Sequence, residues 1–201
     1  AMQNIAMTGI GVAWSVSIGS GESRDGRITG APVVADGRVY TLDAGTTLSA
    51  LDATSGTRIW QIDLAPEGSR SSAGGGGLAV AGDRIFAATG QAQVMAIDVR
   101  SGKEIWRTGL TAPSRSGPTI AGNRVFAISV DNQLHALDAT TGRKLWSQAG
   151  ITENAGLFGA SSPAVEGNSD PRAAGRPGPT AWRARNARMP CRCCPMSGDC
   201  R

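Results

Sequence analysis

The chain has 201 residues, is rich in glycine (28) and poor in aromatic side chains (4%), which is typical of many short strands joined by tight turns. Residues 1–170 carry 13 Lys and Arg against 15 Asp and Glu, whereas residues 171–201 carry 7 against 1, so the formal charge of +4 arises in the last segment. The mildly acidic body excludes charge-driven binding to nucleic acid, and the lack of an apolar run of 18 residues excludes a transmembrane helix.

Three blocks of 30 residues superpose without a gap, and each ends on a tryptophan: 31–60, 77–106 and 117–146. Every block carries an aromatic residue 20 positions before that tryptophan, an aspartate eight before it and a glycine four before it. Successive tryptophans, counted from Trp14, are 46, 46 and 40 residues apart, which is the length of one propeller blade. The repeat therefore predicts an all-β fold, a partial β-propeller with three complete blades.

Each block predicts four antiparallel strands, because short apolar runs alternate with turn residues. In the first block the strands are expected at 33–34, 38–42, 47–51 and 57–63. Asp36-Gly37 separates the first two strands and is a strong signal for a tight hairpin. The second and third blocks repeat this order, and no stretch has the sustained periodicity of a helix.

The propeller is expected to occupy residues 1–170. Blades are predicted at about 31–62, 77–108 and 117–148, with partial blades before 30 and after 158. Trp14 is predicted to lie in the last strand of the preceding blade, and residues 159–168 restart the pattern of the third block.

Three residue types recur for structural reasons. The glycines sit where a hairpin needs a positive φ, the aspartates can accept hydrogen bonds from turn N–H groups, and the tryptophans can pack between blades. The motif residues are Trp14, Asp52, Gly56, Trp60, Asp98, Gly102, Trp106, Asp138, Gly142 and Trp146.

The motif A-x-D-x-x-[ST]-G-x-x-x-W, seen at 50–60 and 136–146, resembles the tryptophan-docking repeat of the pyrroloquinoline-quinone-like propellers. Within that superfamily the chain is most similar to the outer-membrane protein assembly factors of the BamB family, over about residues 8–168. The resemblance implies an eight-bladed ring at the periplasmic face of the outer membrane. It also implies a scaffold without enzymatic activity that docks on the periplasmic domains of the barrel-inserting outer-membrane protein. The family's lipid anchor and targeting signal are not found in this sequence.

The connection 111–119 resembles the loop that this family presents to its partner, with Arg115 as the matching basic residue between Ser114 and Ser116. These three residues are the predicted partner-binding site. The alternative is an ordinary solvated arginine on a surface loop.

The same superfamily contains quinone-dependent alcohol and glucose dehydrogenases, which is the alternative function. The resemblance implies that such an enzyme holds a buried quinone and a Ca²⁺ ion bound by carboxylate and amide oxygens. The acids of residues 1–170 fall mainly in turns, so no catalytic, cofactor-binding or metal-binding residue is predicted. The single histidine, His135, stands where the first block has Ser49, and this variable position predicts an exposed strand residue rather than a ligand.

Two segments carry no blade pattern. Residues 71–77 (SSAGGGG) lack the Lys-[Ser/Thr] pair of a phosphate loop and are predicted to connect two blades. Residues 171–201 hold five prolines, seven arginines and all four cysteines. A frameshifted end is the preferred interpretation of this tail, and a disordered basic tail or a cysteine metal site are the alternatives.

Overall fold

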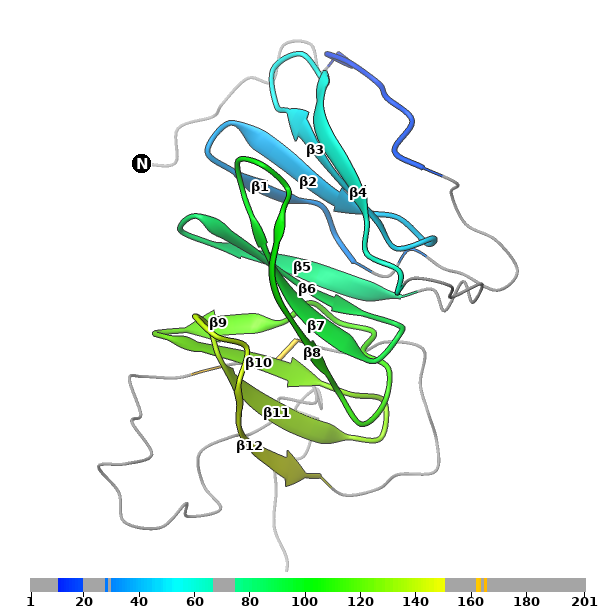
Figure 1. Ribbon diagram of the computed structural model, residues 1–201. Coiled ribbons are helices and arrows are strands. Elements are labelled where there is room, and N and C mark those ends of the chain that lie inside the picture. Colours follow the sequence, from blue (N-terminus) through cyan, green and yellow to red (C-terminus); the bar gives the residue numbers. More distant parts are fainter. Residues whose placement is uncertain are drawn as a thin grey trace, which may run out of the picture. The chain divides into compact units, whose positions relative to one another are not determined.

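The repeated turns bring the four strands of each block into one antiparallel sheet, and Figure 1 shows three such sheets. The computed structural model describes residues 11–19, 28, 30–66, 75–150, 162–163 and 165. All three sheets belong to the unit Ala1–Pro163, and the second unit of the chain is Ala164–Arg201. The prediction of an all-β chain with three four-stranded blades is confirmed. Within the described ranges, no helix is long and apolar enough to cross a membrane.

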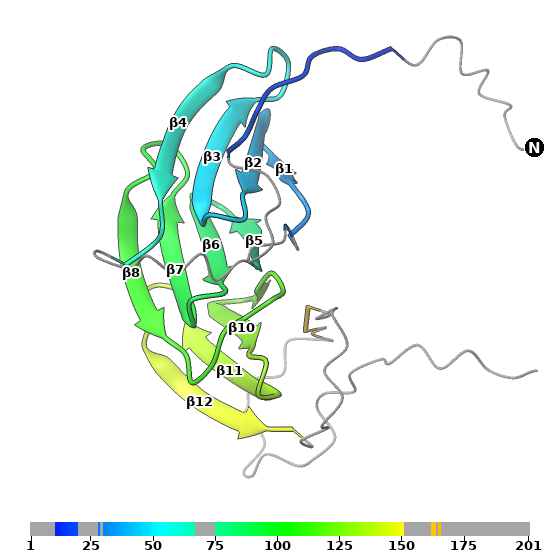
Figure 2. The same ribbon diagram turned by 90° about the vertical axis from the view of Figure 1, so that its right-hand side faces the viewer.

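Each blade is a simple meander in which every strand pairs with the next one along the chain. The first blade consists of β1 (Val33–Ala35), β2 (Arg38–Leu42), β3 (Thr47–Asp52) and β4 (Arg58–Asp63). The second consists of β5 (Gly76–Ala81), β6 (Arg84–Thr89), β7 (Gln93–Asp98) and β8 (Glu104–Gly109). The third consists of β9 (Thr119–Ala121), β10 (Arg124–Ile128), β11 (Gln133–Asp138) and β12 (Lys144–Ala149). Figure 2 shows β4, β8 and β12 following one another along one edge.

The first hairpin closes as its sequence predicts, because Asp36 and Gly37 both adopt positive φ angles, 48° and 71°. The segment 11–19, which contains Trp14, pairs with no strand among the described residues, so the partial blade before residue 30 stays a prediction. Most of the segments 71–77 and 159–168, and the whole tail 171–201, lie outside the described residues.

A β-bulge in the fourth strand of each blade directs its tryptophan toward the next blade. In the first blade Ala50 pairs with Trp60 but Leu51 pairs with Arg58, so Ile59 is the extra residue. The same shift occurs between Ala96 and Ile97 and between Ala136 and Leu137. Such a bulge changes the face on which the following side chains lie.

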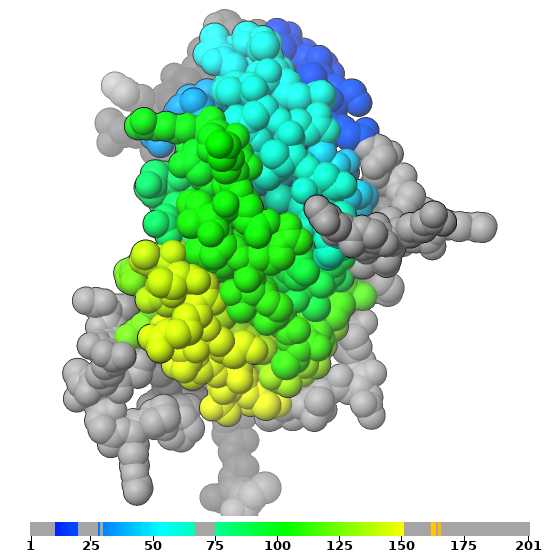
Figure 3. Space-filling model, in the orientation of Figure 1, coloured from blue at the N-terminus to red at the C-terminus, as the bar shows by residue number. Residues whose placement is uncertain are grey.

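Two apolar cores lie between adjacent blades. The interface between the first and second blades is the first seam, and that between the second and third is the second seam. In the first seam, Tyr40 and Leu48 pack with Ile85 and Met95. In the second seam, Phe86 and Val94 of the second blade pack with Val125 and Leu137 of the third. Figure 3 shows the three blades in contact along the face that it presents. The core of this protein is therefore between sheets, as in a propeller.

The indole N–H of a tryptophan donates to a backbone carbonyl oxygen of the following blade at each described junction. Trp14 Nε1 lies 3.0 Å from Ala53 O, Trp60 Nε1 lies 3.1 Å from Val99 O, and Trp106 Nε1 lies 3.1 Å from Ala139 O. The accepting residue is always the one after the motif aspartate, so the same hydrogen bond recurs at each of these junctions. Trp146 packs on Phe126 with ring centroids 6.0 Å apart.

The motif glycines supply the flat surface on which these indoles lie. A Cβ atom would approach the ring carbons of Trp14, Trp60 and Trp106 to 2.7, 2.9 and 2.5 Å at Gly56, Gly102 and Gly142 respectively. These glycines also have φ angles of 71°, 70° and 73°. Only glycine meets both requirements without strain.

An arginine strengthens each seam in a way that the sequence analysis missed. Arg38 Nη1 donates to Val99 O at 2.8 Å, and Arg84 Nη1 donates to Ala139 O at 2.9 Å. Each of these carbonyl oxygens therefore accepts from both a tryptophan and an arginine of the preceding blade. The sequence does contain a pattern that points to these arginines: an arginine stands 22 residues before the tryptophan in every block, at positions 38, 84 and 124.

Replacing Trp106 by alanine is expected to destabilise the chain by about 3–5 kcal/mol, because a buried indole and its hydrogen bond to the third blade are lost. Ile105→Ala is the matched control in the same strand, and its half-exposed side chain predicts a loss of about 1 kcal/mol or less. Urea unfolding followed by circular dichroism measures both values. Equal losses in the two variants would contradict the seam role of Trp106.

Gly142→Ala is expected to cost more than Gly122→Ala, although both glycines have positive φ. The backbone strain is common to the two and amounts to about 1–2 kcal/mol. Only Gly142 has an indole against it, whereas a Cβ at Gly122 meets nothing within 4 Å. Overpacking adds about 1–3 kcal/mol to Gly142→Ala alone. Denaturant unfolding of the two variants gives the difference, and a difference near zero would show that the indole simply moves aside.

Candidate functional site

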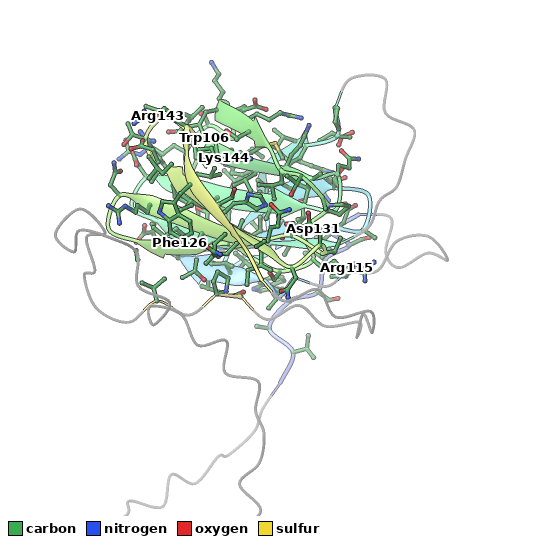
Figure 4. The ribbon with its side chains drawn as sticks, turned by 90° about the horizontal axis from the view of Figure 1, so that it is seen from below. Trp106, Arg115, Phe126, Asp131, Arg143 and Lys144 are labelled. Atoms are coloured by element: carbon green, nitrogen blue, oxygen red, sulfur yellow. The ribbon has the colours of Figure 1, made fainter. Side chains whose placement is uncertain are left out.

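The residues predicted to contact a partner lie in the connection between β8 and β9, here called the docking loop (residues 110–118). Arg115 is exposed, whereas Ser114 and Ser116 are 0% and 5% exposed. Figure 4 labels Arg115 and Asp131 on one side of the blades and Arg143 on another. The structure therefore exposes the arginine side chain and places its two serine neighbours inside the protein.

Ser114 anchors the docking loop to both neighbouring blades. Its backbone N–H donates to Thr89 O at 3.1 Å in the second blade, and its hydroxyl donates to Ile128 O at 2.9 Å in the third. The loop also accepts a bond, because Val130 N–H donates to Pro113 O at 2.8 Å. The chain immediately before Arg115 is thus held across the second seam.

His135 lies beneath this loop. The sequence predicted an exposed strand residue at this position, and that prediction is wrong. Its side chain is 0% exposed. It pairs with Ala127 on the face of the third blade that packs against the second. Counted back from the tryptophan, its counterparts are Ser49 and Met95, which are also fully buried. A variable position on a strand is therefore not an exposed one here, since the neighbouring blade covers that face.

Two hydroxyl groups and a carboxylate surround the imidazole of His135. Nε2 lies 3.1 Å from Ser129 Oγ and 3.3 Å from Thr111 Oγ1. Thr111 Oγ1 donates to Asp131 Oδ2 at 3.0 Å, and Ser129 Oγ donates to Asp131 Oδ1. Nδ1 of His135 has no hydrogen-bond partner. These four residues join the docking loop to the turn between β10 and β11.

Burial lowers the pKa of His135 from its ordinary value, and the charge of Lys144 lowers it further, although Asp131 acts in the opposite direction. The imidazole is therefore neutral at pH 7. Burial alone would raise the pKa of Asp131, but hydrogen bonds donated by Ser129 and Thr111 outweigh it and lower this pKa. The cluster accordingly holds one negative charge, on the carboxylate.

Ser129, His135 and Asp131 have the residue types of a nucleophilic triad but not its arrangement. In a triad the carboxylate accepts from the histidine nitrogen that faces away from the serine. Here Asp131 accepts from the serine and threonine hydroxyls, and the far nitrogen of His135 is unpaired. Ser129 is also buried, so a substrate has no access to its hydroxyl. The geometry supports a structural cluster rather than a catalytic one.

The motif aspartates close the turns on the opposite end of each blade. Asp98 Oδ1 accepts from the Ser101 hydroxyl and the Ser101 N–H at 2.7 Å each, and from Arg100 N–H at 3.1 Å. These bonds, the Ser101 hydroxyl first, lower the pKa of Asp98. Asp52 and Asp138 make the corresponding bonds and also have lowered pKa values. Across the described ranges, no three His, Cys, Asp or Glu side chains lie close enough to hold a metal ion.

A family model described as outer membrane protein assembly factor BamB matches residues 11–73 and 44–174 of the chain. The chain belongs to this family. The two matches overlap because a repeated blade can be aligned to the same model in more than one register. Family membership agrees with the predicted resemblance to the pyrroloquinoline-quinone-like propellers.

Solved structures show the same likeness. BamB from Moraxella catarrhalis is 25% identical with a TM-score of 0.51, over 62% of this chain and 38% of that protein. Quinohemoprotein alcohol dehydrogenase ADHIIG from Pseudomonas putida HK5 is 22% identical with a TM-score of 0.52, over 63% and 21% of the two chains. The computationally designed protein Ika8 is 16% identical with a TM-score of 0.57, over 74% and 43%. The curated proteins include no match.

The chain therefore spans about two fifths of the length of the BamB structure and about one fifth of that of the dehydrogenase. At 22% identity the dehydrogenase shares the fold alone with this chain.

Asp98→Asn tests whether the turn carboxylate stabilises the blade. Because the folded-state pKa of Asp98 lies below its ordinary value of 3.8, its contribution is present above that value and is lost as the pH falls through the folded-state pKa. The variant is expected to melt below the wild type at about pH 7, and the gap in melting temperature is expected to narrow as the pH falls below 3.8. Thermal unfolding across this range checks it, and a gap that stays constant with pH would exclude a role for the charge.

Proposed function

We propose that this chain is part of a non-enzymatic propeller scaffold that acts at the periplasmic face of the outer membrane. In this proposal the docking loop binds the periplasmic domains of the barrel-inserting outer-membrane protein, with Arg115 as the central contact. The proposal extends to the intact protein the role for which its family is named. Membrane association would come from a lipid anchor, and no nucleic acid or cofactor takes part.

The observation that carries the proposal is an exposed arginine that directly follows two loop residues, Pro113 and Ser114, which are hydrogen-bonded to the two neighbouring blades. Thr89 O, Ile128 O and Val130 N–H fix the loop at the second seam without using the Arg115 backbone. A preorganised loop loses little conformational entropy when it binds, so its contacts contribute more to affinity. The exposed side chains of Pro113 and Val130 add an apolar surface beside the arginine.

A quinone-dependent dehydrogenase is the second candidate, because such enzymes are among the similar structures. That function needs oxygen ligands for Ca²⁺ gathered in one place. The three motif aspartates of the described blades instead accept hydrogen bonds within separate turns, so these residues do not fit a calcium–quinone site. No chemical step through a quinone is assigned to them.

Arg115→Glu is expected to weaken binding of the chain to the purified periplasmic domains of the barrel-inserting protein by at least about tenfold, since it reverses a charge in the contact. Arg143→Glu is the matched control, because Arg143 is also exposed but lies in the β11–β12 turn on the other end of the blade. Isothermal titration at two salt concentrations measures both variants.

Equal weakening by the two substitutions, or none by either, would contradict the proposed contact. In a parallel assay the chain is mixed with pyrroloquinoline quinone and Ca²⁺ and tested for dye reduction with alcohols or glucose. Turnover above background would favour the dehydrogenase instead.

A further inference from the structure

His135 makes the second seam chemically different from the first. At the equivalent position of the second blade, Met95 fills the first seam with a purely apolar side chain. A methionine therefore satisfies the packing requirement of this position. The histidine adds a polar group that packing alone does not need, and a polar group in a buried place requires a hydrogen-bonding reason.

That reason is the link between the docking loop and the β10–β11 turn. Thr111 uses its only hydroxyl proton to donate to Asp131. The Ser129 hydroxyl proton is directed to Asp131 or to Gln133 O, both of which are acceptors. Each hydroxyl oxygen is then left to accept, so Nε2 of His135 carries the proton and donates to both. The neutral Nε2–H tautomer is the one that fits.

We propose that His135 is a positioning residue of the docking loop, which it holds by donating from Nε2 to Thr111 while Ser129 and Asp131 complete the same cluster. Thr111 lies at the beginning of the loop, four residues before Arg115, and Ser114 holds the loop next to Arg115. Because Thr111 and Ser114 are both held, the backbone of Arg115 has a defined position relative to the second seam. The importance of this for binding rests on the proposed function.

His135→Met is the decisive variant, because it copies Met95 of the neighbouring blade and removes the donor while keeping a side chain of suitable size. His135→Gln is the rescue variant, since its amide nitrogen can donate from about the same place as Nε2. Thr111→Val breaks the same link from the loop and leaves the histidine in place.

Four quantities are measured on the full chain. They are the melting temperature, the rate of hydrogen exchange of the 111–116 amides, the rate of tryptic cleavage after Arg115, and the affinity for the periplasmic domains. His135→Met is expected to leave the melting temperature nearly unchanged, to speed exchange at 111–116 by about tenfold and to weaken binding by a similar factor, as two lost hydrogen bonds allow. His135→Gln is expected to behave like the wild type. His135→Met combined with Thr111→Val is expected to add little to either single change.

The outcomes separate the two proposals. Unchanged exchange and cleavage in both His135→Met and Thr111→Val would overturn the positioning role. Faster exchange in these variants, with partner binding insensitive to them and to Arg115→Glu, would support the positioning role and contradict the proposed function. If His135→Met unfolds, the exchange measured in Thr111→Val decides, because that variant retains the buried histidine.

Discussion

The contact on which the rest of this structure depends is an indole lying on a glycine of the next blade. Each blade touches only its neighbours, so the stability of the array is a sum of blade and seam terms. At every described junction one tryptophan N–H reaches a carbonyl that lies 33 to 39 residues further along the chain. Where the tryptophan lies within a blade, an arginine donates to that same carbonyl oxygen, which places two donors on one acceptor. The seam is therefore directional as well as apolar.

This arrangement explains why the loops can differ while the blades remain alike. The tryptophan, glycine and aspartate of the motif hold the turns at one end of each blade, and the docking loop lies at the other end. The tryptophan–glycine contact and the tryptophan hydrogen bond therefore do not involve the docking loop. Structures of both BamB and a quinohemoprotein dehydrogenase are similar to this chain, which is expected if function lies in loops and added sites rather than in the repeat.

The second seam shows how a scaffold position can acquire a further role. Met95 and His135 occupy equivalent places and both are buried, yet only the histidine forms hydrogen bonds to a loop. A buried polar cluster is stable only if its members satisfy one another, and Ser129, Thr111 and Asp131 do so here. The cluster lies under the loop whose arginine is exposed, so packing of the seam and presentation of the loop are coupled through a few hydrogen bonds.

The sequence by itself determined the number of strands per blade, the hairpin turns and the places of the motif residues, because these follow from local periodicity and from the turn chemistry of Asp36-Gly37 and Gly56. It did not determine which carbonyl each tryptophan or arginine reaches, since those partners are 33 to 61 residues away. Nor did it reveal that His135, Ser114 and Ser116 are buried. Strand alternation assigns a side chain to one face of a sheet, but only the neighbouring blade decides whether that face meets water or another core.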